Sequence, residues 1–334
     1  MPRGDGILSM GLTAGVDIGA TRLRVCLGGD DGRIVARTSE PSSREGSGRA
    51  LSAQIEHCIR RLLAERGAST VRRVGIATVG PLDRRGGIAN PANLPKVGFV
   101  PLVKPILKAF GGQVVLINDC SAAAVAEREA GRGKGFDSLV YLTLSTGIGA
   151  GVFVDGHLLV GKDGNAHEIG HLVIDKEGGL VCGCGKRGHW EAYCSGRNIP
   201  HLAAIVLRGE EARRVEALTA AEIFRQAKVG DESCAKVIIE VGRLNAIGCA
   251  GVVDAYDPEL LVLGGSVALH NAEEVLAPIR EGIRSFARNN APIVALTDLG
   301  EDAVLIGAML VALHPRAYPG LRPWTFGGKR GSVP

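Results

Sequence analysis

The sequence predicts an α/β protein with two domains. Predicted strands and helices alternate along most of the chain, which is typical of sheets covered by helices. At 334 residues the chain is longer than one small hydrophobic core organises. A unit of strand, glycine turn, strand, turn and strand near the N-terminus also recurs about 125 residues later, and this repeat indicates an internal duplication.

The composition narrows the classes of function. Hydrophobic residues make up 46% and charged residues 22% of the chain, as in globular proteins. The net charge of +4 comes from scattered Lys and Arg without a run of five, so no nucleic-acid partner is expected. No segment approaches 18 apolar residues and the N-terminus lacks a secretory signal, so we expect a cytoplasmic protein with no membrane partner.

The first half of the chain begins with a loose arm, residues 1–12. Alternating apolar residues and glycine turns then predict strands at 14–19, 22–27 and 33–38. The elements expected next are a helix at 49–66, a strand at 71–79, a helix at 100–110, a strand at 114–117, and a helix at 121–130 for which Ser121 is the candidate N-cap.

The second half repeats the opening pattern and then becomes helical. Strands are expected at 138–144, 150–154 and 157–160, with a glycine turn at 145–149. The later elements are a helix opened by the capping box Thr219–Glu222, a helix at 232–253, a strand at 259–263, a helix at 272–287, a strand at 293–297 and a helix at 302–313.

These elements suggest where the domains divide. We expect a smaller N-terminal α/β domain over residues 1–118, closed by the helix at 302–313, and a larger α/β domain over residues 119–301. The tail, residues 314–334, is rich in Pro, Gly and Arg and is expected to be flexible.

Two glycine turns carry groups that suit phosphate binding. In the first, Asp17 can hold hydrated Mg²⁺, Gly19 permits close approach of the backbone, and Thr21 supplies a hydroxyl. Taken alone, such a turn is also a common hairpin. The second turn, around Thr146 and Gly147, repeats the design, and its successive N–H groups can form an anion-binding nest. A late strand ends in Gly264 and Gly265, which are candidate nucleoside contacts.

Asn118 and Asp119 follow a buried strand. Open α/β sheets place their functional residues at the carboxyl ends of strands, so Asp119 is a candidate general base for a hydroxyl that attacks a phosphate. The alternative is that this pair only forms a turn or an N-cap for the helix that follows.

The most specific signal is a cluster of histidines and cysteines. His171, Cys182, Cys184 and His189 lie within 19 residues of sequence and supply four donors of the kind that Zn²⁺ prefers. Four protein ligands close a tetrahedral site, so the zinc is predicted to be structural. Cys194 is a competing fourth ligand, and we favour His189. The remaining cysteines suit core positions rather than a disulfide framework.

On these residues the chain resembles the ROK family (repressors, open reading frames and sugar kinases), and most closely its ATP-dependent glucokinase and hexokinase branch. The motifs that carry the resemblance are DIGAT at 17–21, GPLD at 80–83, NL at 93–94, ND at 118–119, STGIGAG at 145–151, EIGH at 168–171 and CGCGKRGHWE at 182–191.

The resemblance implies an actin-like, ribonuclease-H-like fold, with two α/β domains around a central cleft that binds ATP and a sugar. It implies that Asp119 is the catalytic base and that Mg²⁺ accompanies the ATP. It also implies a homo-oligomer, either a dimer or a tetramer. The residues expected to bind sugar hydroxyls are Asn93, Asn118, Glu168, His171 and Glu191.

The chain departs from the family pattern at four positions. His189 stands where the family usually has a third cysteine, Ala20 and Ser145 replace glycines in the two phosphate turns, and Val97 stands where glucokinases often have a tryptophan. Imidazole can replace a thiolate on zinc. The change at Val97 leaves the preferred sugar open.

Three functions compete on this basis. The first is phosphorylation of the 6-hydroxyl of glucose or a related hexose, with an N-acetylated amino sugar, mannose or fructose as alternative acceptors. The second is a sugar-responsive repressor, disfavoured because only about 13 residues precede the first phosphate turn and no DNA-binding segment is expected there. The third is a non-catalytic sugar-binding protein, disfavoured because Asp119 is present.

Overall fold

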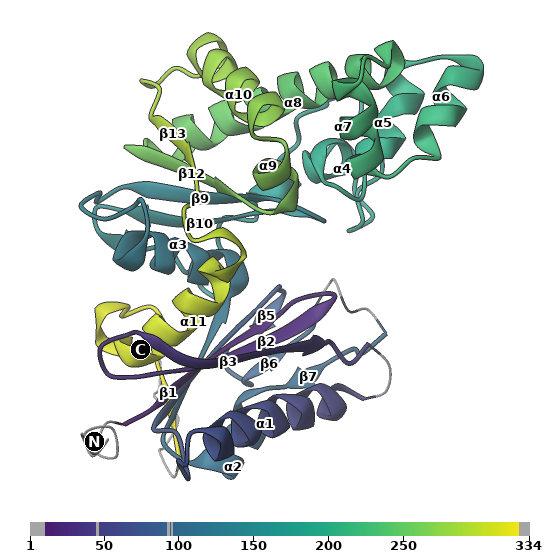
Figure 1. Cartoon of the computed structure of the whole chain (residues 1–334). Helices are drawn as coiled ribbons and strands as arrows, with labels where there is room; N and C mark the ends of the chain where they lie inside the picture. The colour runs from purple at the N-terminus through teal and green to yellow at the C-terminus, as the bar shows by residue number, and fades with distance from the viewer. Residues whose placement is uncertain (1–10, 45–46, 92–93, 95, 327–334) are drawn as a thin grey trace, which may run out of the picture. The chain divides into compact units, whose positions relative to one another are not determined.

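A computed structural model of the chain describes residues 11–44, 47–91, 94 and 96–326 (Figure 1). The chain divides into two compact units: unit 1 comprises residues 1–126, 158–166 and 302–334, and unit 2 comprises residues 127–157 and 167–301. Asn93 and most of the expected N-terminal arm lie outside the described residues.

The elements of unit 1 begin with a meander of three strands. In chain order they are β1 (Thr13–Ile18), β2 (Arg22–Gly28), β3 (Ile34–Pro41), α1 (Gly48–Glu65), β4 (Arg73–Thr78), β5 (Leu82–Asp83), β6 (Ile88–Ala89), β7 (Val100–Pro101), α2 (Val103–Phe110), β8 (Gln113–Asn118), α3 (Asp119–Ala130), which continues into unit 2, α11 (Ala303–Leu313), the 3₁₀ turn η3 (Pro315–Ala317) and β14 (Trp324–Thr325).

Unit 2 repeats the meander and adds a larger set of helices. Its elements are β9 (Leu139–Leu144), β10 (Ile148–Val154), β11 (His157–Leu158), η1 (Ile169–His171), α4 (Glu191–Cys194), α5 (Ile199–Val206), α6 (Gly209–Glu216), α7 (Ala220–Lys228), α8 (Glu232–Tyr256), β12 (Leu260–Gly264), α9 (Ser266–His270), α10 (Ala272–Phe286), β13 (Ile293–Leu296) and η2 (Gly300–Asp302). The last residues of β11 and η2, Leu158 and Asp302, belong to unit 1.

The two main sheets share the order of five strands. This order is β3-β2-β1-β4-β8 in unit 1, where β14 adds a sixth strand beside β8, and β11-β10-β9-β12-β13 in unit 2. In both, the first strand pairs antiparallel with the second and parallel with the strand that follows the meander. This common topology confirms the duplication predicted from the repeated strand and turn pattern.

Helices cover both faces of the sheet in unit 1 (Figure 1). Alternate residues of β1 join a core with the buried side of α1. On the opposite face lie two glycines, Gly15 of β1 and Gly75 of β4, which are aligned across the strands. A Cβ on Gly75 would lie 1.7 Å from the carbonyl oxygen of Ala308 in α11. These glycines therefore let α11 lie directly against the sheet.

In unit 2 the 25-residue helix α8 packs closely against α10. A Cβ on Gly242 would lie 2.9 Å from the ring of Pro278, and one on Gly282 would lie 2.2 Å from the Cβ of Ala246. Small residues at the contact thus bring the two helices together.

Some expected boundaries need correction. The helix expected at 121–130 begins at Asp119, so Ser121 lies inside its first turn and is not the N-cap. The start of the helix expected at 100–110 forms β7 instead. The tail was expected to be flexible, but Trp324 and Thr325 pair antiparallel with β8, because that edge strand offers unpaired backbone groups. The capping box at Thr219 is confirmed.

Candidate functional site

The first candidate residues gather where the parallel strands of unit 1 end. Strands β1, β4 and β8 run parallel, and their last residues, Ile18, Thr78 and Asn118, are aligned across the sheet. The first phosphate turn and Asp119 each follow one of these residues. Unit 1 therefore places the predicted phosphate turn and the predicted base at the same edge.

Backbone contacts define the first phosphate turn. The Gly19 N–H donates to the Arg22 carbonyl at 3.0 Å, and a Cβ on Gly19 would lie 2.8 Å from the same oxygen. The Ser42 hydroxyl donates to the Gly19 carbonyl at 2.7 Å, and the Ser42 N–H donates to the Thr21 carbonyl at 3.0 Å. Ser42 therefore supports the turn. No local sequence signal marks Ser42, because it lies 23 residues beyond Gly19.

Asp17 is almost fully buried on β1. Arg24 stands opposite it on β2, and the two side chains form an ion pair with a nitrogen–oxygen distance of 3.7 Å. The carboxylate is thus held beside the turn by a cation that the sequence did not identify. A buried carboxylate in this position suits the binding of metal-bound water.

Asn118 and Asp119 start helix α3. The Asn118 side-chain oxygen accepts the N–H groups of Cys120 and Ser121 at 2.9 and 3.1 Å, so Asn118 is the capping residue. Burial raises the pKa of the Asp119 carboxyl, while the Cys120 N–H, at 2.9 Å from its Oδ1, opposes the shift. Asn118 therefore caps the helix, and this cap is compatible with a catalytic role for the neighbouring Asp119.

The second phosphate turn joins β9 to β10 in unit 2. The Ser145 N–H donates to the Gly147 carbonyl at 3.0 Å, and the Ser145 carbonyl accepts the Gly196 N–H at 2.7 Å. The Ile148 N–H donates to Glu191 Oε2 at 2.9 Å. The two outer N–H groups are therefore engaged within the protein. A phosphate would meet the inner N–H groups, those of Thr146 and Gly147.

Gly264 and Gly265 lie beside this second turn. Strand β12 pairs with β9, and the Ser145 and Ser266 hydroxyl oxygens lie 3.2 Å apart. Gly265 has a φ of +85°, and a Cβ there would lie 2.5 Å from the Leu144 carbonyl oxygen. Only glycine fits this backbone. The strand pairing and the serine contact place the predicted nucleoside contacts next to the predicted phosphate contacts.

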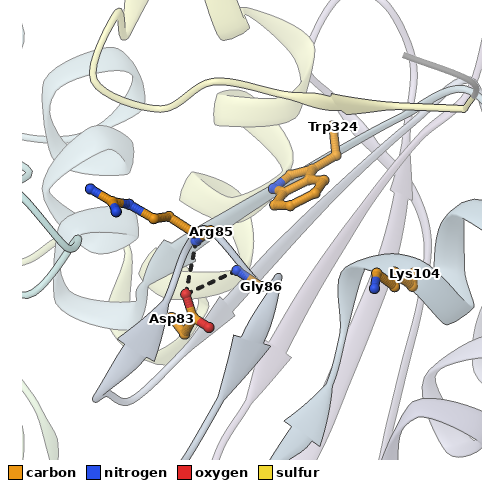
Figure 2. Close-up of a pocket in the computed structure, with 5 residues that line it drawn as sticks. All are labelled: Asp83, Arg85, Gly86, Lys104 and Trp324. Carbon is orange, nitrogen blue, oxygen red and sulfur yellow. Dashed lines mark hydrogen bonds between the residues drawn. The ribbon is translucent and has the colours of Figure 1, made fainter. Parts of the chain in front are cut away.

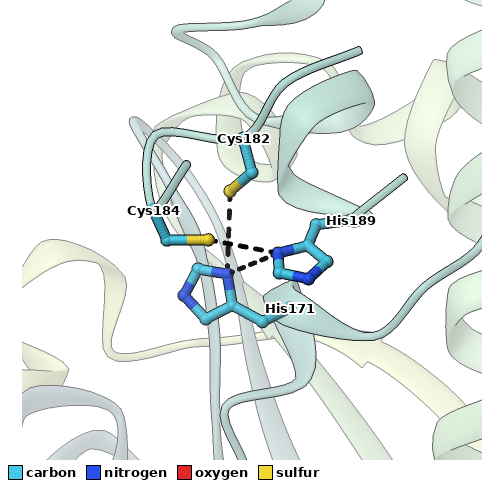
Figure 3. A group of neighbouring side chains, drawn as sticks. All are labelled: His171, Cys182, Cys184 and His189. Atoms are coloured by element: carbon cyan, nitrogen blue, oxygen red, sulfur yellow. Dashed lines mark hydrogen bonds between the residues drawn. The ribbon is translucent and has the colours of Figure 1, made fainter. Parts of the chain in front are cut away.

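The four predicted zinc ligands converge in unit 2 (Figure 3). The ligand atoms of His171, Cys182, Cys184 and His189 all lie within 4.8 Å of one another. The His171 Nδ1 lies 3.3 Å from His189 Nδ1 and 3.7 Å from Cys182 Sγ, and the Cys184 Sγ lies 3.3 Å from His189 Nδ1. Tetrahedral zinc with bonds of about 2.0–2.3 Å holds its ligand atoms about 3.3–3.8 Å apart, so this set fits the metal.

Cys194 is not part of this cluster. It is fully buried, and its Sγ points to the Val241 carbonyl of α8 at 3.7 Å. His189 is the residue that faces the other three. Burial, followed by the charge of His171, lowers the pKa of His189, and this shift favours the neutral imidazole that binds metals.

Glu168 and Glu191 flank the cluster. The His171 ring uses Nδ1 within the cluster, while its Nε2 lies 3.9 Å from Glu168 Oε2. The Glu191 Oε1 lies 3.8 Å from Cys182 Sγ. The sugar contacts predicted at Glu168, His171 and Glu191 therefore lie together in unit 2. About half of the Glu168 side chain is exposed.

Aromatic residues anchor the loop that carries the cluster. Trp190 is fully buried, its indole N–H donates to Asn245 of α8 at 2.9 Å, and Gly248 of α8 leaves room for the ring. The Tyr193 hydroxyl binds Asp175 and accepts the N–H of Leu180. The hydrogen bond from Tyr193 lowers the pKa of Asp175. The Trp190 contacts thus fasten the loop to α8 through side chains other than those of the cluster.

Asn165 is another residue that the sequence did not single out. Its side-chain oxygen accepts the Leu82 N–H at 2.9 Å, and its amide donates to the Leu82 carbonyl at 3.3 Å. This pair fastens residues 158–166 to the β5 segment of unit 1. No local sequence signal reveals it, because the two residues are 83 positions apart.

A hollow of about 270 Å³ also lies on unit 1 (Figure 2). The residues that line it are Asp83, Arg85, Gly86, Lys104 and Trp324. The Asp83 carboxylate accepts the N–H groups of Arg85 and Gly86 at 3.0 and 2.9 Å. The aspartate of the GPLD motif thus closes a turn. None of the predicted site residues that the structure describes lines this hollow.

Among the residues that the structure describes, none of the helices combines the length and the apolar character that a bilayer-spanning segment requires.

Known proteins are similar to this chain over about nine-tenths of its length. A glucokinase from Aeropyrum pernix is 37% identical over 91% of this chain and 98% of its own length. An N-acetylmannosamine kinase from Citrobacter koseri is 35% identical over 90% of this chain and 98% of its own length. A ROK family glucokinase from Streptomyces griseus, solved in complex with glucose and AMPPNP, is 30% identical, covers 90% of this chain and 99% of its own, and superposes with a TM-score of 0.73.

The superposition and the duplicated sheets confirm the predicted actin-like α/β fold. The model of the ROK family matches residues 13–314, which span both units. The motifs at the two phosphate turns, at Asp119 and at the histidine and cysteine cluster all lie within that match. The chain therefore belongs to the ROK family.

Proposed function

We propose that this protein is an ATP-dependent hexokinase that transfers the γ-phosphate of ATP to the 6-hydroxyl of glucose or a related hexose. The observation that carries the proposal is the position of Asp119, whose carboxyl follows β8 at the same sheet edge as the first phosphate turn. Membership of a family that includes named glucokinases supports this activity.

Asp119 is the proposed general base. Its carboxylate accepts the proton of the sugar 6-hydroxyl as the oxygen attacks the γ-phosphorus. A bond forms between that oxygen and phosphorus, and the bond from phosphorus to the bridging oxygen breaks to release ADP. Burial raises the pKa of Asp119, which makes the carboxylate a stronger base than a solvated aspartate.

The proposed sugar contacts are carboxylates, amides and one imidazole. A hexose presents neighbouring hydroxyls that each donate and accept, and fixed acceptors such as Glu168 and Glu191 orient them. His171 would use Nε2 toward the sugar because its Nδ1 faces the cluster. The complete proposed set is Asn93, Asn118, Asp119, Glu168, His171 and Glu191.

The nucleotide is assigned to the two glycine turns. The inner N–H groups of Thr146 and Gly147 would meet the phosphates, and Gly264 and Gly265 would adjoin the nucleoside. From the other turn we propose Asp17, Gly19 and Thr21. Mg²⁺ bound with ATP would neutralise phosphate charge, and the Asp17 carboxylate is the group that suits its water ligands.

Zinc is the proposed occupant of the histidine and cysteine cluster. His171, Cys182, Cys184 and His189 are four protein ligands, so the metal would have no open position and would not act on substrate. Its effect would be to fix the ring of His171, and through it one sugar contact. We further propose that the protein works in the cytoplasm as a homo-oligomer without nucleic-acid or membrane partners.

An N-acetylated amino sugar is the second candidate acceptor. A relative named for N-acetylmannosamine is nearly as similar to this chain as one named for glucose. Val97 is buried at the position where a tryptophan is common in glucokinases, so the resemblance to glucokinases does not extend to this position.

The test is a coupled assay of ADP formation with a panel of hexoses and amino sugars, with and without Mg²⁺. We expect Mg²⁺-dependent turnover with glucose or a close relative, and a loss of about 10²–10⁴-fold in kcat for Asp119→Ala. Binding of glucose to that variant, measured by calorimetry, should remain. Turnover of Asp119→Ala near the wild-type rate would refute the role of the base. No turnover with any sugar would refute the function.

A further inference from the structure

The segment after the histidine and cysteine cluster contacts the second phosphate turn at both of its ends. Glu191 follows His189 by two residues, and its Oε2 accepts the N–H of Ile148 at 2.9 Å. Gly196, five residues later, donates its N–H to the Ser145 carbonyl at 2.7 Å. Ser145 and Ile148 are the residues on either side of Thr146 and Gly147, so residues 191–196 fix the conformation of the turn between them.

The fit between Glu191 and the turn is close. A Cβ on Gly147 would lie 2.7 Å from Glu191 Oε2, so any side chain at that position would displace the carboxylate. The glycine of this turn therefore does more than leave space for a phosphate. It also leaves space for the carboxylate that holds the neighbouring N–H.

The same carboxylate reaches the cluster. Glu191 Oε1 lies 3.8 Å from Cys182 Sγ, while Oε2 is bound to Ile148. The backbone of Glu191 is fixed as well, because its carbonyl accepts the Asn198 side-chain amide at 3.0 Å and the Ser195 N–H at 3.3 Å. One side chain thus connects the cluster with the turn, and both of its oxygens are directed within unit 2.

We propose that Glu191 is a positioning residue for the nucleotide phosphates, in addition to its proposed contact with the sugar. This inference rests on the proposed kinase function. It states that the Glu191 carboxylate holds the second phosphate turn in its phosphate-binding conformation. Under this proposal Glu191 affects two affinities: the affinity for sugar, and the affinity for ADP or ATP in the absence of sugar. A residue that only contacts sugar would have the first effect alone.

The test measures ADP binding by calorimetry on the sugar-free, metal-containing protein. Glu191→Ala should weaken ADP binding about tenfold, the loss expected when one hydrogen bond to a charged acceptor is removed. Glu191→Gln keeps an acceptor for the Ile148 N–H and should stay within about twofold of wild type. Gly147→Ala should weaken ADP binding as Glu191→Ala does, and the double variant should be no worse than either single one.

Glu168→Ala is the matched control. Glu168 also flanks the cluster and is a proposed sugar contact, and its Oε2 lies 3.9 Å from His171 Nε2. This variant should lose sugar affinity and keep the wild-type affinity for ADP. Metal content per chain, measured on every variant, checks that the cluster is intact.

Amide exchange gives a readout that needs no ligand. The Ile148 N–H should exchange at least tenfold faster in Glu191→Ala than in wild type, and at the wild-type rate in Glu168→Ala. Wild-type ADP affinity together with unchanged exchange in Glu191→Ala would overturn the positioning role and leave the kinase function standing. Absence of ADP binding by the wild-type protein would instead refute the kinase function, and the exchange rate would still decide the role of Glu191.

Discussion

At the scale of single residues, two neighbours in the chain have different roles: Asn118 supports the helix, and Asp119 is the proposed base. Asn118 caps α3 through its side-chain oxygen, so the adjacent Asp119 carboxyl is not needed as the cap. Burial keeps the pKa of Asp119 above its ordinary value, and the helix N-terminus limits that rise. The proposed base therefore owes its basicity to its place at the end of a buried strand.

The pH dependence of the reaction should report this shift. A base acts only when deprotonated, so kcat/KM should rise with pH, with an acidic limb whose midpoint lies above the ordinary aspartate value of 3.8. The measurement is a pH profile of kcat/KM with glucose in excess Mg²⁺. A limb at or below the ordinary value would show that Asp119 is not perturbed, or that another group limits the rate.

The same shift has a consequence for stability. A carboxyl whose pKa is raised by folding favours the folded state when protonated, and this contribution is lost as the pH rises through the folded pKa. Asp119 should therefore destabilise the protein at neutral pH, and Asp119→Asn should have a Tm at pH 7.5 no lower than wild type, with the difference shrinking toward pH 4. A lower Tm for Asp119→Asn at pH 7.5 would contradict the raised pKa.

At the scale of secondary-structure elements, close approaches of backbone decide how helices meet the sheets. In unit 1, Gly15 and Gly75 form a glycine pair under α11, and the carbonyl oxygen of Ala308 occupies the space that a Cβ on Gly75 would need. In contrast, Gly251 is exposed in α8, and a Cβ there would meet nothing within 4 Å. The two glycines should respond to alanine with opposite signs.

Gly75→Ala should destabilise the protein by about 3 kcal/mol because α11 must move away from the sheet. Gly251→Ala should stabilise it by about 1 kcal/mol, since alanine loses less backbone entropy in a helix interior. Urea unfolding of both variants, followed by circular dichroism, measures the two changes. Equal effects of the same sign would show that the close approach of α11 does not depend on Gly75.

The elements that could be predicted from sequence are those whose pattern is local. The periodicity of α8, the capping box at Thr219 and the repeated strand and turn units each lie within a short window, and the structure agrees with them. β14 could not be predicted in this way, because Trp324 forms a strand only where the edge of β8 is available. The N-cap was misplaced by three residues, since Asn118 and Ser121 are both good capping residues and only the end of β8 decides between them.

The candidate site shows the same division. The residues of the two turns and the cluster were found because their types and spacing indicate phosphate and metal binding. Ser42 and Asn165 carry no local sequence signal, because each forms its hydrogen bonds with residues more than 20 positions away. The engagement of the Ile148 N–H by Glu191 is likewise a tertiary contact between residues 43 positions apart.

At the scale of the whole molecule, the duplicated fold has become asymmetric. Both units keep the same strand order and a glycine turn after the first strand. Of the described residues, those that could hold a metal ion through at least three His, Cys, Asp or Glu side chains lie in unit 2, where a long loop follows the repeated meander. That loop connects to the second turn through Glu191. If the cluster binds zinc as proposed, the conformation of unit 2 should depend on the metal and that of unit 1 should not.

Removal of the metal should therefore act on unit 2 selectively. Elemental analysis should find about one zinc per chain in the wild-type protein and in Cys194→Ala, because the Cys194 thiol faces α8, and should find little zinc in Cys184→Ser. Bound metal stabilises the folded state by mass action, so a strong chelator should lower the Tm and speed amide exchange in residues 168–198 and 145–149. Residues of β1, β4 and β8 should exchange at unchanged rates below the temperature of global unfolding. Equal zinc content in Cys184→Ser and wild type would rule out the cluster as the metal site. Faster amide exchange throughout both units would show that the metal stabilises the whole molecule rather than the loop that holds it.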